Sequence, residues 1–102
     1  MKEISAKELK ELIDNKADFT LIDVREEYEY DDANLKGHLI PMGEVAERLS
    51  EIPRDKKVVV HCRSGKRSAG VIHMLESQHG YTNLYNLKGG ILAYLEETGN
   101  NA

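Results

Sequence analysis

The sequence has one cysteine, no long hydrophobic run and no excess of basic residues. A single thiol, that of Cys62, cannot form an intrachain disulfide or supply the cysteine cluster of a structural zinc site. No stretch approaches the roughly 20 apolar residues that span a bilayer, and the first residues lack the apolar segment of a signal peptide. We therefore expect a cytoplasmic protein with no membrane partner, no metal and no organic cofactor.

The overall composition is that of an ordinary folded domain. The chain has 102 residues, of which 40% are hydrophobic and 31% charged. Fourteen basic against eighteen acidic residues give a net charge of -4, which disfavours a nucleic-acid partner. We expect residues 1–102 to form one domain, with a flexible tail over about residues 98–102.

Hydrophobic periodicity predicts that helices and strands alternate along the chain. A capping box, Ser5 with Glu8, marks the start of the first helix. The predicted helices span about 6–15, 42–52, 68–79 and 91–96. The predicted strands span 19–24, 57–62 and 82–87, with a helical turn at 25–30, a loop at 31–37 and a brief strand at 37–40. This alternation predicts an α/β fold with a parallel sheet and helices on both faces.

Cys62 lies where such a fold places its ligand site. It ends the most hydrophobic predicted strand, and ligands of open parallel sheets bind beyond the carboxyl ends of the strands. The loop that follows leads into a helix, so successive N–H groups can turn inward around an anion. Gly65 supplies backbone freedom, and the loop also carries Arg63, Lys66 and Arg67. These features predict a lowered pKa and a nucleophilic thiolate at Cys62.

Two other interpretations of this region follow from the residues. Cys62 can instead be a small buried hydrophobic residue that points back into the sheet. His61 adjoins it in sequence, but neighbouring side chains of a strand point to opposite faces, so we interpret His61 as structural rather than as a general base.

Four segments, in the same order as in the family, give the chain a resemblance to the rhodanese-like sulfurtransferases, the rhodanese homology domain family. They are 21–29 (LIDVREEYE), 37–41 (GHLIP), 62–68 (CRSGKRS) and 86–91 (NLKGGI). The resemblance implies a sheet of about five largely parallel strands. It also implies that Cys62 takes sulfur from an anionic donor such as thiosulfate, forms a persulfide, and passes the sulfur to cyanide or a thiol.

The candidate site follows from the loop and from this resemblance. Cys62 is the nucleophile, and the loop that holds the donor and the persulfide consists of Arg63, Ser64, Gly65, Lys66, Arg67 and Ser68. Asp23 and Arg25 end a predicted strand on the same side and are candidate supporting residues, with a structural ion pair as the alternative. Glycines 89 and 90 are expected to allow close backbone approach to the loop.

Other functions remain open at the level of sequence. The chain can act as a sulfur-relay module that exchanges sulfur with a protein partner only. A cysteine phosphatase is less well supported, because phosphatases of related fold place five residues between cysteine and arginine, whereas four separate Cys62 from Arg67. The segment 37–43 is shorter than in most of the family, which leaves the shape of the pocket rim undefined.

Overall fold

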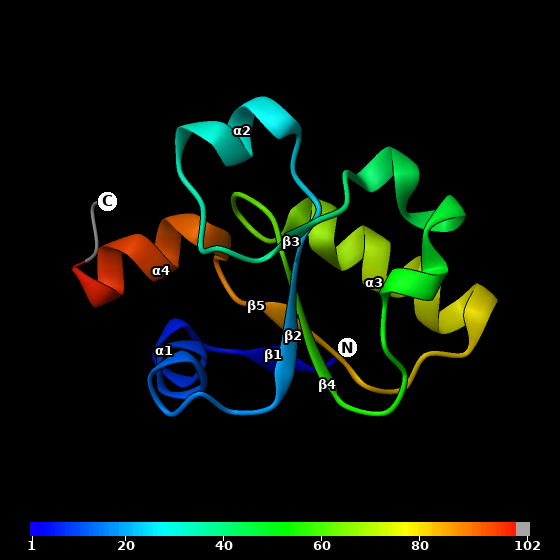
Figure 1. The fold of residues 1–102 in the computed structure, drawn as a ribbon, viewed down its shortest axis with the longest axis horizontal. Coiled ribbons are helices and arrows are strands. Elements are labelled where there is room, and N and C mark those ends of the chain that lie inside the picture. The colour runs from blue at the N-terminus through cyan, green and yellow to red at the C-terminus, as the bar shows by residue number, and fades with distance from the viewer. Residues whose placement is uncertain (100–102) are drawn as a thin grey trace.

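Five short strands form one sheet in which every neighbouring pair is parallel (Figure 1). The computed structural model describes residues 1–99. In chain order the strands are β1 (Glu3–Ile4), β2 (Phe19–Asp23), β3 (His38–Leu39), β4 (Lys57–His61) and β5 (Leu84–Leu87). Across the sheet the order is β1-β5-β4-β2-β3, so β4, the most deeply buried strand, is central.

Helices cover both faces of the sheet. They are α1 (Ala6–Asp14), α2 (Glu27–Asp32), α3 (Lys66–His79) and α4 (Gly90–Thr98). In Figure 1, α1 and α4 lie on one side of the sheet and α3 on the other. The predicted α/β fold, with five parallel strands and helices on both faces, is therefore confirmed. Of the predicted tail, Thr98 ends α4, and residues 100–102 lie outside the described residues.

Side-chain alternation along β4 divides the hydrophobic interior into two cores. Val58 and Val60 pack on the α3 side, with Ile72 of α3. Val59 packs on the opposite side, with Leu9 of α1. We call these the α3-side core and the α1–α4 core. Burying each such side chain is worth roughly 1.5–3 kcal/mol, so both cores hold β4 in place and fix the position of the residue that follows it.

The predicted helix over 42–52 is wrong. The segment forms two 3₁₀ helices, η1 (Met42–Glu47) and η2 (Leu49–Glu51), separated by Arg48 at φ -124° and ψ 32°. A 3₁₀ helix rises about 2.0 Å per residue, against about 1.5 Å in an α-helix. The segment can therefore cover a longer path and still bury Val45 and Ile52 in the α3-side core.

Other elements also differ from the sequence prediction: β5 starts two residues later than predicted, at Leu84, and α4 spans Gly90–Thr98 rather than 91–96. β1 was not predicted, because two residues carry no periodicity; it is held by the N–H groups of Asn86 and Lys88 in β5 and just beyond it. α2 continues to Asp32, where a loop was expected. α3 starts at Lys66, two residues earlier than predicted, and so draws the end of the cysteine loop into its first turn.

The parallel arrangement brings the carboxyl ends of the strands to one edge. In Figure 1, α2 lies beyond this edge, near the end of β2. Cys62 follows β4 at the same edge, and Asp23 ends β2 beside it, since Asp23 and His61 pair in register. None of the helices in the described part of the chain is long and hydrophobic enough to cross a membrane.

Candidate active site around Cys62

The Cys62 side chain is buried, and its sulfur faces a group of hydrogen-bond donors. The residue is 1% exposed and borders the α3-side core. Sγ accepts from the Gly65 N–H at 3.1 Å, from the Ser68 N–H at 3.4 Å and lies 3.4 Å from the Ser68 hydroxyl. The cysteine is thus buried, as one interpretation held, but it points at the loop amides rather than away from them.

Two opposing effects act on the pKa of the Cys62 thiol. Burial is the largest and raises the pKa, because it disfavours the charged form. Hydrogen bonds from the Ser68 hydroxyl and from the N–H groups of Ser68, Gly65 and Ser64 lower it. Together they outweigh burial, so the pKa of Cys62 lies below its ordinary value, in the direction expected from the sequence.

The N-terminus of α4 fixes the direction of two peptide groups in the loop. The N–H groups of Ile91 and Leu92 donate to the carbonyls of Cys62 and Arg63, at 2.9 and 3.2 Å. The N–H and C=O of a trans peptide point in opposite directions. Anchoring the Arg63 carbonyl on α4 therefore turns the next N–H, that of Ser64, toward the sulfur.

Gly90 makes this anchoring possible. A Cβ at this position would lie 2.7 Å from the Cys62 carbonyl oxygen and closer still to that of Arg63. Gly90 also has φ +64°, which side chains disfavour. The expected close approach of the backbone to the loop is confirmed at this glycine.

Arg67 does not point freely toward an anion, because Glu29 of α2 holds it. The guanidinium donates to both carboxylate oxygens of Glu29, at 2.7 and 2.8 Å. The hydrogen bond from Arg67 lowers the pKa of Glu29 to about 2, so the pair is ionised across the physiological range. This pair joins the first turn of α3 to α2.

Asp23 and Arg25 form a buried ion pair that also supports α2. The two side chains share hydrogen bonds of 2.8 to 3.1 Å. Arg25 further donates to the Ala33 carbonyl at 2.8 Å, at the end of α2. The alternative considered for these residues, a structural ion pair, matches this geometry; neither side chain contacts the sulfur loop directly in the hydrogen-bond network.

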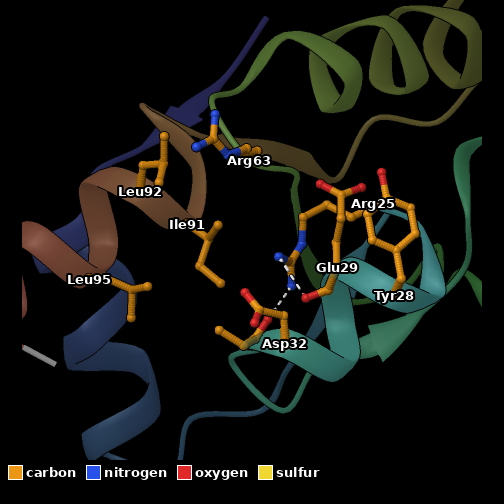
Figure 2. Close-up of a pocket in the computed structure, with 9 residues that line it drawn as sticks. Arg25, Tyr28, Glu29, Asp32, Arg63, Ile91, Leu92 and Leu95 are labelled. Carbon is orange, nitrogen blue, oxygen red and sulfur yellow. Dashed lines mark hydrogen bonds between the residues drawn. The ribbon is translucent and has the colours of Figure 1, made fainter. Parts of the chain in front are cut away.

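The remaining loop residues form an exposed rim. Arg63, Ser64 and Lys66 are solvent-exposed, and within the described residues neither cation pairs with an acidic side chain. Arg63 borders a cleft of about 450 Å³ between α2 and α4. Figure 2 shows Tyr28 and Asp32 of α2 on one side of this cleft and Leu92 and Leu95 of α4 on the other. The cleft therefore leads from solvent to the loop.

His61 is placed away from the reacting side of Cys62. Its side chain is fully buried, and its Nε2 lies 3.7 Å from Asp23 Oδ2, outside hydrogen-bond range. Burial lowers the pKa of His61, with the charge of Asp23 opposing it, so the ring is neutral at physiological pH. This agrees with the structural role expected for His61.

Two residues of the site were not identified from the sequence. Glu29 pairs with Arg67 across 38 positions of sequence. Asn86 of β5 contacts Ser68 and Gly65 from the neighbouring strand. The one available signal was a polar residue at an inward-facing position of an otherwise apolar strand, Leu84–Leu87. Among residues 1–99, no group of three or more His, Cys, Asp or Glu side chains is arranged to hold a metal ion.

Comparison with known proteins covers nearly the whole chain. The family model for the rhodanese-like domain matches residues 5–97. A sulfurtransferase of Allochromatium vinosum is 39% identical over 98 residues, covering 90% of this chain and 86% of the relative. A putative sulfurtransferase of Bacillus subtilis, YtwF, is 38% identical over 99 residues, covering 96% and 94%.

Solved structures show the same architecture. A rhodanese-related protein from Thermoplasma volcanium superimposes with a TM-score of 0.82 at 33% sequence identity. The superposition covers 95% of this chain and 93% of that one. The likeness therefore extends over the sheet, the helices and the cysteine loop together.

Proposed function

Because this chain belongs to the rhodanese-like domain family, we propose that it is a sulfurtransferase in which Cys62 carries the transferred sulfur as a persulfide. The observation that carries the proposal is the set of donors around Sγ, from Ser64, Gly65 and Ser68. The backbone N–H donors among them are fixed by the fold and stabilise negative charge on sulfur without reorganising during the reaction. They serve both the thiolate that attacks and the persulfide that results.

The proposed reaction has two balanced steps. The Cys62 thiolate attacks the outer sulfur of thiosulfate; a new S–S bond forms, the S–S bond of thiosulfate breaks, and sulfite leaves with the electron pair. The acceptor, cyanide or a thiolate, then attacks the outer sulfur of the persulfide. The S–S bond of the persulfide breaks, its electron pair returns to Cys62 as the thiolate, and thiocyanate or a new persulfide is released.

The charge of the rim supports an anionic sulfur donor. Arg63 and Lys66 are exposed beside the loop, in a chain whose net charge is -4. A local positive rim on a negative protein attracts a small anion to this edge. Thiosulfate fits this description, since it is a small dianion whose sulfonate oxygens can meet the cations when its outer sulfur approaches Sγ.

The Arg67–Glu29 pair argues against the phosphatase alternative. Phosphoryl transfer needs a cationic group on the transferring phosphate, whereas Glu29 takes two of the five N–H groups of Arg67 and offsets its charge. The spacing of four residues between Cys62 and Arg67 also leaves fewer amides in the loop. The shorter loop favours the binding of a single sulfur atom, and the pairing of Arg67 makes it less available to a phosphate.

A sulfur-relay role is the second candidate, and the cleft beside Arg63 favours it. Tyr28 and Leu92, which border this cleft, are 74% and 44% exposed. Exposed apolar side chains next to a reactive group are suited to contact with another protein. In this version the acceptor is a thiol of a partner protein, and small-molecule turnover is incidental.

Intact mass spectrometry after incubation with thiosulfate tests the proposal. The protein is expected to gain the mass of one sulfur atom and to lose it on reduction, whereas Cys62→Ser gains nothing. Steady-state turnover with thiosulfate and cyanide, at a KM in the usual range of roughly 1 μM to 1 mM, supports the enzyme over the relay role. Loading without turnover supports the relay role.

Two results would overturn the sulfurtransferase assignment. One is the absence of any mass gain in protein whose Cys62 is reduced and free. The other is hydrolysis of an aryl phosphate, lost in Cys62→Ser, by protein that takes up no sulfur.

A further inference from the structure

Ser68 has one hydroxyl proton and three acceptors within reach. Its Oγ lies 2.6 Å from Asn86 Oδ1, 3.2 Å from the Gly65 carbonyl oxygen and 3.4 Å from Cys62 Sγ. A hydroxyl supplies one donor, so these acceptors compete for it. The shortest of the three distances is that to Asn86, which indicates where the proton lies at rest.

The orientation of the Asn86 amide is fixed by its other hydrogen bond. Nδ2 donates to the Gly65 carbonyl at 3.2 Å. A flipped amide would place its oxygen against that carbonyl, which cannot donate. Oδ1 therefore faces Ser68 and acts as an acceptor there. Both residues are buried, Asn86 at 5% and Ser68 at 0% exposure, so each depends on this bond.

The fold brings the two residues together for a simple reason. Leu84 of β5 belongs to the α3-side core, and alternation puts Asn86 on the same face. Asn86 pairs in register with Val60, two residues before Cys62. Since α3 starts at Lys66, Ser68 lies in its first turn, directly above this part of the sheet.

We propose that Asn86 is a positioning residue that holds the Ser68 hydroxyl proton away from the Cys62 sulfur until the sulfur is ionised. In the thiol form, Ser68 donates to Asn86, and its oxygen is free to accept from the thiol. In the thiolate form, the sulfur is the stronger, charged acceptor, and the hydroxyl turns to it. Asn86 thus competes with the sulfur for one proton and opposes ionisation of Cys62.

Charged groups around the loop are the same whether or not Asn86 is present. Arg67 acts on the sulfur and is paired with Glu29 of α2. Asp23 and Arg25 form their own pair at the end of β2. His61 is neutral and lies on the opposite face of β4. The exposed cations of the rim, Arg63 and Lys66, belong to the loop itself, and Lys88 follows β5. An effect of Asn86 on Cys62 therefore passes through its own two contacts, the Ser68 hydroxyl and the Gly65 carbonyl, and a Ser68→Ala background separates the two routes.

A double-mutant cycle on thiol ionisation tests this inference. The rate of Cys62 alkylation by iodoacetamide is measured against pH in the native protein, Asn86→Ala, Ser68→Ala and the double variant. Asn86→Ala is expected to lower the midpoint by roughly half a pH unit, about a threefold gain in thiolate below the midpoint, because the hydroxyl is freed for the sulfur. Ser68→Ala is expected to raise the midpoint, and Asn86→Ala is then without effect in that background.

Asn83→Ala is the matched control. Asn83 is also a partly buried asparagine whose Nδ2 donates to two backbone carbonyls, those of Pro53 and Lys56, but it lies just before β5, at the end of the sheet away from Cys62. Its removal is expected to reduce stability without moving the alkylation midpoint.

The isosteric Asn86→Asp provides a second probe. Its carboxylate is a stronger acceptor than the amide oxygen, so the alkylation midpoint is expected to rise, and to rise less when Ser68 is replaced by alanine.

The inference is overturned if Asn86→Ala raises the midpoint or leaves it unchanged, or if it shifts the midpoint equally with and without Ser68. It rests on the proposed function only in taking Cys62 as the reacting sulfur, and alkylation requires no sulfur transfer. If the effect of Asn86→Ala on the alkylation midpoint depends on Ser68 but Cys62 takes up no sulfur, only the proposed function is rejected. If Cys62 takes up sulfur but the effect of Asn86→Ala does not depend on Ser68, only the role of Asn86 is rejected.

Discussion

The ionisation of the Cys62 thiol depends on the few groups that surround its sulfur. Burial alone would raise the pKa of its thiol, and the donors of the loop reverse that effect. The alkylation rate of Cys62 is therefore expected to follow a midpoint below that of an ordinary thiol and to fall as the pH drops through the midpoint.

This prediction is checked by comparing the pH dependence of Cys62 alkylation in folded and in unfolded protein. In strong urea the same cysteine is expected to titrate as an ordinary thiol, so the two profiles separate. Cys62→Ser gives the background, since the chain has no other cysteine. Coinciding folded and unfolded profiles would show that the loop donors do not stabilise the thiolate.

The Glu29–Arg67 pair makes a second prediction at this scale. Glu29→Gln keeps the shape of the side chain but removes its charge, and is expected to reduce the free energy of unfolding at pH 7 by about 1–2 kcal/mol. The pKa of Glu29 is lowered from 4.5 to about 2. Its stabilisation is thus fully present above pH 4.5 and is lost as the pH falls toward 2.

Urea unfolding at pH 7 and at pH 3 measures this difference. The difference in the free energy of unfolding between the native protein and Glu29→Gln is expected to be smaller at pH 3 than at pH 7. Glu27→Gln, on the exposed face of the same helix, is the control and is expected to change stability by less than about 0.5 kcal/mol. A gap that stays constant with pH would mean that the carboxylate charge does not contribute.

The residues of the site differ in how far the sequence could predict them. Cys62 and its loop follow from local pattern: a hydrophobic strand, then glycine and cations, then a helix. Glu29 and Asn86 do not, because their partners lie 38 and 18 positions away. A glutamate in the first turn of a helix and an asparagine in a strand carry no local sign of which distant side chain they contact.

Among the secondary-structure elements, α4 has the most direct effect on the loop. Its first N–H groups hold the Cys62 and Arg63 carbonyls, and Gly90 permits the contact. Gly90→Ala is expected to push the loop away from α4, turn the Ser64 N–H from the sulfur and slow alkylation of Cys62 at pH 7. The positive φ and the overlap together are expected to cost about 2 kcal/mol or more of stability.

Gly70→Ala is the matched control for this prediction. Gly70 lies in α3, is exposed, and has open space where a Cβ would be placed. Alanine there is expected to stabilise the protein by about 0.5–1 kcal/mol and to leave alkylation unchanged. Equal effects of the two substitutions on alkylation would contradict the role given to α4.

The sequence predicted the longer helices and strands well, because they have enough residues to show a hydrophobic period. β2, β4, β5, α1 and α3 each carry enough residues to show a period of two or of 3.6. The segment 42–52 misled because apolar residues spaced by three and four suit a 3₁₀ helix as well as an α-helix over so short a length. The choice between them depends on the distance that the segment must cover, which its own residues do not encode.

For the molecule as a whole, both cores share the sheet, and the Cys62 loop follows the carboxyl end of its central strand, β4. Tyr81 lies in the α3-side core and Tyr94 in the α1–α4 core, so tyrosine fluorescence reports on both. Unfolding in urea is expected to be two-state, with the same midpoint by fluorescence and by exposure of Cys62 to a thiol reagent.

The comparison requires a brief pulse of reagent at each urea concentration. If Cys62 becomes reactive at a lower urea concentration than the one at which tyrosine fluorescence changes, the loop opens by itself. Such local opening would contradict the anchoring by α4, α2 and β5 described above.

Since Cys62 is the one thiol of this sequence, a sulfur atom loaded onto it under the proposed function has no second thiol within these 102 residues to receive it. Discharge from this domain then needs an acceptor from outside it, and its frequency follows the concentration of that acceptor. When acceptor is scarce, the protein acts as a stoichiometric store of sulfur; when it is plentiful, the same molecule cycles as a catalyst.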